Sequence, residues 1–312
     1  MWWLTDQPEA TAAFLPAGHA WSPGQTECFS PADRALWALL GDRADCWRCT
    51  TALSVPYPDR RVILIDHAPF SQFAALQTAL RAGVTLPDGL IGLALAGTGF
   101  HGQRQRSWTA LRGNLHLVAH YRLDLLAASA EAALVMLPVV VAAESIERTS
   151  GGRCAPAIKW VNDLILPAGK VAGVLTSTQI EGDRVVCALF GIGVNLEAAP
   201  AMAPTPWVPR AAALADADPG LRGKLPKLFA TLAAALDEEV RTLRENGSDD
   251  LYQRYRARSA CIGQEVRLWP ASCDDPDRTP PRVRGRVADI LPDLSLRLEG
   301  RAEPIRNARL VL

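Results

Sequence analysis

The sequence lacks an excess of charge of either sign, and this absence limits the partners of the protein. Lys plus Arg number 33 and Asp plus Glu number 33 in 312 residues, so the formal net charge is zero. A chain without a net positive field has no general means of holding nucleic acid or an anionic membrane. We therefore expect neither as a partner, and we expect any binding of anions to be local.

The sequence also lacks the apolar segments that mark secretion and membrane insertion. Residues 1–6 contain no basic stretch followed by an apolar one, so we expect no secretory signal and a cytoplasmic protein. The most apolar run, Ala132 to Ala143, is well short of the ~20 residues that a membrane span needs. We predict a core helix from Ser129 to Arg148, ended by Gly151, in which Pro138 makes a bend or marks the true beginning.

The sequence also lacks the second pair of Cys or His residues that a zinc site would need beside its single C-x-x-C pair. Seven cysteines, an odd number, are scattered through the chain, which is typical of free buried thiols rather than of a disulfide framework. Cys46 and Cys49 form a C-x-x-C pair, but no second pair of Cys or His accompanies it, and a zinc site needs four ligands. We therefore predict no metal site.

A literal G-x-G-x-x-G is present from Gly97 to Gly102, but its surroundings do not suit a dinucleotide site. Such a site needs a helix directly after the glycines, because the helix N-terminus holds the pyrophosphate. Residues 90–96 resemble a buried strand, residues 103–112 have no apolar stripe, and residues 115–121 alternate like a second strand. The segment predicts a strand, a long loop and a strand, which disfavours a dinucleotide-dependent oxidoreductase.

Composition and hydrophobic pattern divide the chain into three parts. Residues 1–60 are rich in Trp and Pro, contain one plausible helix from Pro31 to Leu40, and have no evident role. Residues 61–256 mix strands and helices, and one long apolar strand, Arg184 to Val194, should be central in its sheet. Residues 257–312 contain short strands and turns that predict a small β-barrel or sandwich-like module.

The segment from Lys159 to Asp163 is the sharpest candidate for chemistry. It places a lysine at the end of a buried strand, with Asn162 and Asp163 directly after it. A lysine in that place would face a ligand. The alternative is a lysine that only extends its ammonium to solvent, with Asn162 and Asp163 merely making the turn.

Two further features point to an anionic ligand. Gly191 and Gly193 interrupt a central strand, which marks either a close approach of a ligand or a β-bulge. Arg104, Arg106 and Trp108 alternate in the loop, a spacing that can present guanidinium groups to phosphate beside an aromatic side chain; a solvated basic loop is the other interpretation.

In order and spacing, these features resemble the biotin protein ligase branch of the biotin/lipoate ligase superfamily. The family has a G-R-G-R-x-G-R-x-W loop, then K-W-P-N-D, then G-K-x-x-G-(I/V)-L, then G-x-G-x-N, and a small SH3-like barrel at the end. The counterparts here are Phe100 to Trp108, Lys159 to Asp163, Gly169 to Leu175, Gly191 to Asn195, and the module from Cys261 onward. Residues 1–60 are not covered and do not resemble the winged-helix domain of some members.

The resemblance implies an α+β fold: a class II synthetase-like mixed β-sheet with helices on its faces, plus the C-terminal SH3-like barrel. It also implies that ATP, with Mg²⁺, activates biotin as an acyl adenylate, which a lysine of a biotin-accepting carrier protein then captures; a homodimer is possible. Lys159 and Arg106 would be catalytic. The ligand-binding residues would be Gly102, Gln103, Arg104, Trp108, Trp160, Asn162, Asp163, Lys170, Gly173, Gly191, Gly193 and Asn195.

The chain departs from the family pattern in two places. His101 and Gln103 stand where the first two loop arginines are expected, and Gln105 stands in place of a glycine. The S-T-N triplet that contacts biotin in the family is missing after Asp66. A changed acyl pocket is therefore expected. Two alternatives follow: a lipoate or octanoate ligase, and a non-catalytic protein of the same fold that binds a small acid or nucleotide.

Overall fold

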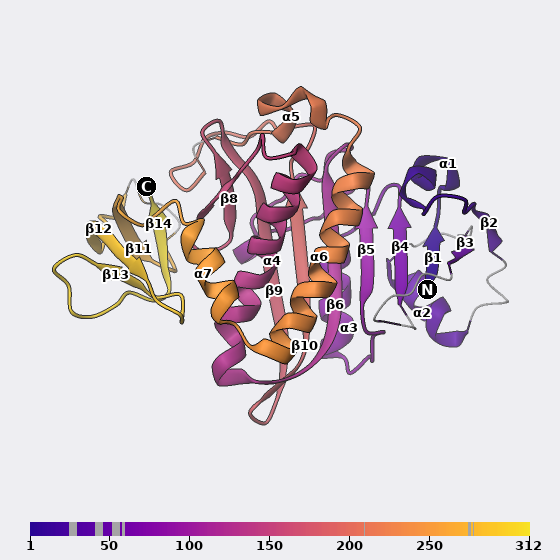
Figure 1. The fold of residues 1–312 in the computed structure, drawn as a ribbon, viewed down its shortest axis with the longest axis horizontal. Helices are drawn as coiled ribbons and strands as arrows, with labels where there is room; N and C mark the ends of the chain where they lie inside the picture. Colours follow the sequence, from indigo (N-terminus) through magenta and orange to yellow (C-terminus); the bar gives the residue numbers. More distant parts are fainter. Residues whose placement is uncertain are drawn as a thin grey trace.

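The computed structural model describes residues 1–24, 30–40, 46–51, 57, 60–208, 210–273, 276 and 278–312 (Figure 1). Within these residues the main element is a mixed sheet of ten strands. In spatial order the strands are β2 (Ser22–Gly24), β3 (Cys46–Thr50), β1 (Trp2–Thr5), β4 (Arg61–Ile65), β5 (Leu90–Ala94), β6 (Leu115–Leu126), β10 (Arg184–Val194), β9 (Gly169–Glu181), β8 (Asp163–Leu166) and β7 (Ala157–Lys159).

Strand β10 lies between β6 and β9 and is antiparallel to both, which confirms the prediction that this apolar strand is central. The parallel pairs are β1 with β4 and β4 with β5. The mixed sheet with helices therefore agrees with the expected fold class.

Helices cover both faces of the sheet (Figure 1). Helices α4 (Ala127–Ser150), α6 (Leu225–Asn246) and α7 (Asp249–Ala257) lie on the face that is in front in Figure 1, and α3 (Gln72–Arg81) lies on the other face. The remaining helices among the described residues are α1 (Pro8–Thr11), α2 (Pro31–Leu40), α5 (Leu214–Ala217) and the 3-10 turns at Ala12–Phe14, Gln103–Gln105 and Pro219–Leu221.

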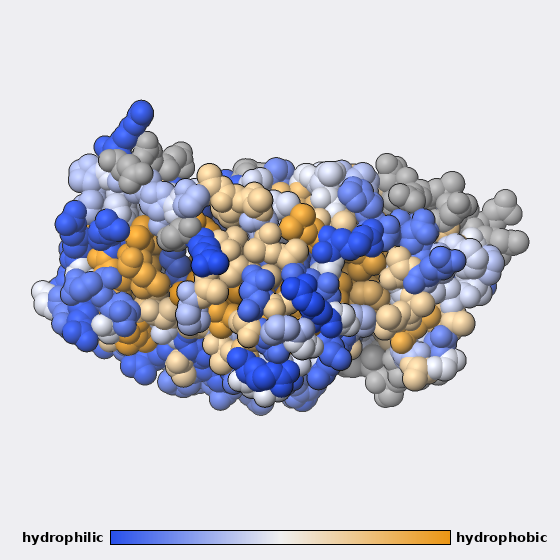
Figure 2. Space-filling view, turned by 90° about the horizontal axis from the view of Figure 1, so that it is seen from above, coloured by the Kyte–Doolittle hydropathy of each residue, from blue (hydrophilic) through white to orange (hydrophobic). Residues whose placement is uncertain are grey.

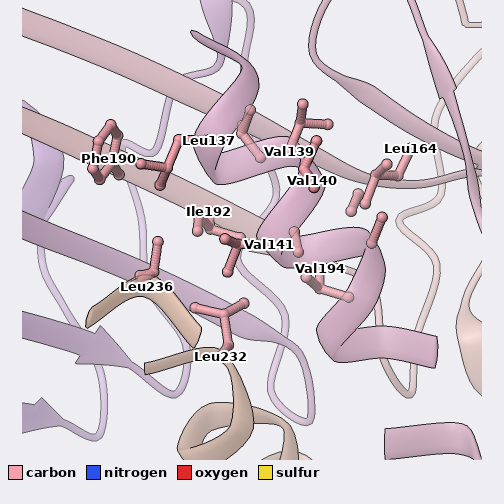
Figure 3. Packing of buried hydrophobic residues seen from close by; sticks show 14 of the residues in the cluster. Leu137, Val139, Val140, Val141, Leu164, Phe190, Ile192, Val194, Leu232 and Leu236 are labelled. Atoms are coloured by element: carbon pink, nitrogen blue, oxygen red, sulfur yellow. The ribbon is translucent and has the colours of Figure 1, made fainter. Parts of the chain in front are cut away.

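The larger core lies between β10 and the helices α4 and α6 (Figure 3). In this view Phe190 of β10 lies beside Leu137 of α4, and Ile192 of β10 lies beside Val141 of α4. Val194, also of β10, and Leu232 of α6 belong to the same cluster. Successive side chains of a strand alternate between faces, so every second residue of β10 faces these helices. Each such buried side chain contributes about 1.5–3 kcal/mol of hydrophobic stabilisation.

Helix α4 is a core helix, as predicted, but it begins at Ala127, and the expectation that Pro138 marks its start is wrong. Proline has no N–H for the carbonyl four residues earlier, here that of Leu134. The Thr176 hydroxyl of β9 donates to that carbonyl at 2.9 Å, and this bond explains how the helix accommodates Pro138. By length and composition α4 could cross a membrane, but 72% of its most apolar window is buried inside the protein.

Residues before β4 add three strands to one edge of the same sheet. Strand β1 runs parallel to β4, with Trp2 opposite Arg61 and Thr5 opposite Leu64. The predicted helix at Pro31–Leu40 is present as α2. The division into residues 1–60, 61–256 and 257–312 stays a prediction, although the first part shares its sheet with the second.

The cysteines on β3 cannot act as a pair of metal ligands. Cys46 packs in the hydrophobic cluster on the α3 side, whereas Cys49 packs in the cluster on the α4 side. Residues three apart on a strand point to opposite faces, so the two thiols diverge. The six cysteines among the described residues are free and buried, in agreement with the predicted free thiols; Cys28 lies outside the described residues.

The C-terminal module is an antiparallel sheet of four strands among the described residues. Its order is β13 (Leu296–Leu298), β12 (Val283–Ile290), β11 (Glu265–Pro270) and β14 (Ala308–Val311). The predicted short strands are therefore present, and the closed SH3-like barrel stays a prediction.

A buried ion pair joins the start of β4 to helix α6. The Arg60 guanidinium contacts one carboxylate oxygen of Asp237, and the Tyr121 hydroxyl donates to the other at 2.8 Å. The side chains of Arg60 and Asp237 are 4% and 11% exposed. The stability of each buried charge depends on its partner, because water cannot reach the pair to solvate a charge that is left alone.

Asp237→Ala is expected to lower the free energy of unfolding by about 3–5 kcal/mol, because it leaves Arg60 buried without its counterion. Urea denaturation measures this change. Arg241→Ala is the matched control: it breaks exposed pairs with Glu238 and Glu245 on the same helix and should change stability by about 0.5 kcal/mol or less. Equal effects of the two substitutions would contradict the assigned importance of the buried pair.

Candidate active site

A cavity of about 1190 Å³ lies over the α3 side of the sheet, bordered by the C-terminal module. Every residue that the sequence analysis assigned to the site lines it: Gly102, Gln103, Arg104, Arg106, Trp108, Lys159, Trp160, Asn162, Asp163, Lys170, Gly173, Gly191, Gly193 and Asn195. These residues come from a loop, a β-hairpin and two central strands. The space-filling view from above shows hydrophobic residues at the surface in the middle of the molecule and over the C-terminal module at the left (Figure 2).

Three glycines form the floor of the cavity. Gly191 and Gly193 occupy the β10 positions that alternate with the core residues, and Gly173 of β9 is directly opposite Gly193. A Cβ on Gly193 would lie 2.6 Å from Cε2 of Trp108, and one on Gly191 would lie 2.9 Å from Cδ2 of Phe73. The ladder is regular at these glycines, and the register shift of β10 is between Val185 and Cys187. The interpretation of the glycines as a bulge is therefore wrong.

The loop before β6 folds back on itself as a small hairpin. The Gly102 N–H donates to the Arg106 carbonyl at 2.7 Å, and the Trp108 N–H donates to the Phe100 carbonyl at 2.9 Å. Arg104 is at the tip with φ +60°, and its guanidinium donates to the Ala271 carbonyl of the C-terminal module. The loop is thus tied to the second sheet.

The Trp108 indole fixes the base of this loop over the glycine floor. Its Nε1–H donates to Nδ1 of His116 on β6 at 3.1 Å, and Nε2 of His116 lies 3.0 Å from the Leu111 carbonyl. Because His116 accepts at Nδ1, its proton is on Nε2, which donates to that carbonyl. Burial lowers the pKa of His116 to about 4, so the ring is neutral at pH 7.

Two lysines lie at the β7–β9 end of the cavity. Lys159 Nζ donates to the Trp207 carbonyl at 2.5 Å, and Lys170 Nζ is 2.6 Å from Oδ1 of Asp163. Burial lowers the pKa of Lys159; Asp163 opposes this shift, whereas Lys170 and Arg106 add to it. A half-buried ammonium among other cations gains stability when an anion binds, so this end of the cavity suits a phosphate or carboxylate.

Three predicted site residues hold the walls of the cavity. Asn162 donates from Nδ2 to the Val174 carbonyl at 2.6 Å, and Trp160 donates from Nε1 to the Leu294 carbonyl at 2.8 Å. Asn195 Nδ2 donates to the Ala212 carbonyl at 3.2 Å. Asp163 pairs with Lys159 in the β7–β8 ladder, so it begins strand β8. The alternative interpretation, in which Asp163 merely makes the turn, is therefore wrong.

Sequence reasoning missed part of the site. Gln72 and Phe73 of α3, His116 of β6, Trp207 and Arg309 also line the cavity. His116 could have been predicted from the sequence, because it lies on the same strand face as Val118, which is opposite Gly191. Trp207 was not, since it lies in a Pro-rich loop without periodicity. The guanidinium carbon of Arg309 is 3.6 Å from the centre of the Trp207 ring, and this stack joins the last strand to the carbonyl that holds Lys159.

No protein-family model matches the chain. The bifunctional ligase/repressor BirA of Bacillus subtilis is 31% identical over 117 residues, which are 36% of this chain and 34% of that protein. The biotin--[acetyl-CoA-carboxylase] ligase of Paracoccus denitrificans is 37% identical over 101 residues, 32% of this chain and 41% of that protein. The biotin protein ligase of Aquifex aeolicus, solved with biotin and ATP, has a TM-score of 0.57 at 17% identity over 80% of this chain and 97% of its own. The protein is biotin protein ligase-like.

A biotin protein ligase-like protein of unknown function from Silicibacter has the same TM-score of 0.57, at 14% identity over 84% of this chain and 96% of its own. The likeness to these solved structures establishes the fold. The matched region spans less than half the length of the curated relatives, so activity, substrates and partners are argued separately from the site.

Gly193→Ala is expected to displace Trp108, because the added methyl group meets the indole ring. The hydrogen bond to His116 would then break and water would reach the imidazole, so the pKa of His116 should rise from about 4 toward the ordinary value near 6.5. An NMR titration of the histidines measures this. Gly285→Ala is the control, since its Cβ would find only an ordinary contact at 3.5 Å. An unchanged His116 pKa in Gly193→Ala would show that the loop does not depend on the bare floor.

Proposed function

We propose that the protein is an ATP-dependent acyl-protein ligase that activates biotin, or a related carboxylic acid, as an acyl adenylate and transfers the acyl group to a lysine of a carrier protein. The observation that carries this proposal is the arrangement of Lys159, Lys170 and Arg106 around one cavity, whose floor of glycines makes room for the Trp108 ring. Partial likeness to biotin ligases supports the same conclusion.

The reaction has two steps. A carboxylate oxygen of the acid attacks the α-phosphorus of ATP, and pyrophosphate leaves. The amine of the acceptor lysine then attacks the acyl carbon, loses a proton, and AMP leaves. In both steps negative charge is redistributed on phosphate oxygens, and fixed cations stabilise it best in a cavity that excludes water.

The residues of the cavity suit these needs. Lys159 would lie between the carboxylate and the phosphate, because its ammonium is partly desolvated and interacts with the charges of Lys170 and Arg106. Arg106 and Arg104 would contribute from the loop. Mg²⁺ would enter with the triphosphate, and Asp163, which Lys170 already neutralises, is a carboxylate of the cavity that could face it. A cytoplasmic location remains a prediction from the sequence, and a homodimer remains a possibility that only the family resemblance suggests.

The two alternatives differ from this proposal in the acid that is activated or in whether any reaction takes place. A lipoate or octanoate ligase would perform the same two steps on a different acid. A non-catalytic binder would use the same cations and glycines to hold a small acid or nucleotide. Exchange of labelled pyrophosphate into ATP, run with Mg²⁺ and with biotin, lipoate, octanoate or no acid, separates them: the acid that supports exchange is the substrate, and binding without exchange favours the binder.

Lys159→Ala is expected to lower the rate of pyrophosphate exchange by about 10²–10³, because a preorganised cation at the reacting phosphate is lost. The fold should remain intact, since the side chain makes one hydrogen bond at the edge of the cavity. Lys227→Ala is the control for removing a lysine that donates to a backbone carbonyl away from the cavity. Normal exchange in Lys159→Ala would rule out the proposed role.

The rate of exchange should fall on the alkaline side at a pH below the ordinary titration of lysine. The pKa of Lys159 is lowered in the free protein, and the ammonium that would stabilise phosphate is lost as pH rises through that lowered pKa. The pH profile of kcat/KM measures this limb. In Lys159→Arg the guanidinium stays charged, so the residual activity should not show it; the same alkaline limb in that variant would assign it to another group.

A further inference from the structure

A small aromatic cluster holds the loop between β10 and α5 against the C-terminal module. Trp207 and Val208 of this loop pack with Trp269 of β11, Cys273 and Val311 of β14, apart from the two larger hydrophobic clusters. The Trp207 and Trp269 rings meet edge to face, with their centres 5.3 Å apart. Trp207 is 8% exposed, although the described residues of its loop form no helix or strand. Contacts with the C-terminal module therefore determine where Trp207 lies.

Arg309 of β14 lies against the face of the Trp207 ring. Its guanidinium carbon is 3.6 Å from the ring centre, well within the ~6 Å at which a cation attracts an aromatic face. Arg309 is 7% exposed, and its guanidinium also donates to the Cys273 carbonyl. The guanidinium is thus fixed by its own strand and by a second bond, so it holds the ring in one place.

The backbone of Trp207 carries this restraint to Lys159. Lys159 Nζ donates to the Trp207 carbonyl at 2.5 Å, and within the described part of the chain this is the one hydrogen bond of the ammonium. Thr205 and Val208 exchange backbone hydrogen bonds of 3.0 and 3.1 Å around Trp207, so its ring and its carbonyl are parts of one tight turn. A lysine ammonium has three donors on a flexible stem. One fixed acceptor therefore orients the stem and leaves two donors for the cavity.

We propose that Arg309 is a positioning residue for Lys159: its stack on Trp207 fixes the carbonyl that orients the ammonium toward the acid and the phosphate. The inference rests on the proposed acyl activation, in which Lys159 is the main cation. Displacing a reacting group by about 1 Å can slow a reaction by up to about 10²-fold. The C-terminal module would then control the rate of a reaction whose main cation belongs to β7.

The first test compares Arg309→Met with Arg286→Met. Methionine keeps an unbranched apolar side chain and has no guanidinium. Arg309→Met is expected to lower kcat for pyrophosphate exchange by about 10- to 10²-fold, because the carbonyl that orients Lys159 is no longer held. Arg286→Met removes an exposed guanidinium of the same sheet, 3.7 Å from Glu299 and outside the cavity, and should leave kcat unchanged. Equal losses in the two variants, or faster exchange in Arg309→Met, would overturn the inference.

A second readout follows Lys159 directly. The chain has four lysines, Lys159, Lys170, Lys224 and Lys227, so an NMR titration of protein with ¹³C-labelled lysine can resolve each of them. Burial lowers the pKa of Lys159 from 10.5, and Arg309→Met should admit water to the ammonium, so its pKa should rise toward that value. The alkaline limb of the exchange rate should move up with it. The other groups that act on this pKa are unchanged in the variant: Asp163, Lys170, Cys261 and Arg106.

Trp269→Phe separates orientation from charge. Trp269 is neutral and does not line the cavity, and its indole donates to the Thr279 carbonyl at 2.7 Å. The smaller ring loses that bond and supports Trp207 less well. We expect a lower kcat and a higher pKa of Lys159, in the same direction as in Arg309→Met but smaller. Changes in Arg309→Met alone would assign them to the lost charge and overturn the inference. A higher KM for ATP with unchanged kcat in Arg309→Met would make Arg309 a ligand contact and overturn it too.

The outcomes also separate this inference from the proposed function. Exchange in the wild-type protein, with kcat and the pKa of Lys159 unchanged in Arg309→Met and Trp269→Phe, would overturn the role of Arg309 alone. A pKa of Lys159 that rises in both variants of a protein that exchanges no pyrophosphate would support the restraint on Lys159 and overturn acyl activation. Neither exchange nor a change in this pKa would overturn both.

Discussion

One strand has to build the core and the candidate site at the same time, and the rest of the structure depends on how it does so. On one face of β10, Phe190, Ile192 and Val194 pack under the helices α4 and α6. On the other face, Gly191 and Gly193 leave room for the rings of Phe73 and Trp108, which pack over them at the cavity. Glycine weakens a strand, because it loses more backbone entropy and packs no side chain. The regular ladders to β6 and β9 on both sides offset that cost.

The electrostatics of the site follow from local placement and not from the overall charge, which is zero. Lys159 is held by the Trp207 carbonyl, and the Trp207 ring is covered by Arg309 of β14. The C-terminal module also accepts hydrogen bonds from Arg104 and Trp160. A module that seems separate in the sequence is thus part of the wall around the cations. Displacing it would alter the position of Lys159 without changing any residue near it.

A structural feature could be predicted from the sequence where the residues of a single segment determine it. The apolar run of β10 predicted a central strand, its two glycines predicted a close approach, and the Lys159 segment predicted a cation at a strand end; all three features meet in one cavity. Sequence reasoning failed where the cause is a distant contact. The pairing of β1 with β4 joins segments about sixty residues apart, and Thr176 relieves Pro138 from another strand. Gln72 is an ordinary polar residue at a helix start until the fold buries it.

The loop over the site is held by contacts within the protein, and it has fewer arginines that could bind an anionic ligand. Compared with the biotin ligase pattern, His101 and Gln103 stand in place of two loop arginines, so fewer cations can draw the loop onto an anion. Here the loop is held instead by its internal hairpin, by the bond from Trp108 to His116, and by the bond from Arg104 to Ala271. A loop that is already ordered loses less conformational entropy when a ligand binds. Fewer charged contacts are then needed for the same closure, and under the proposed function neutral groups within the cavity would discriminate among acids.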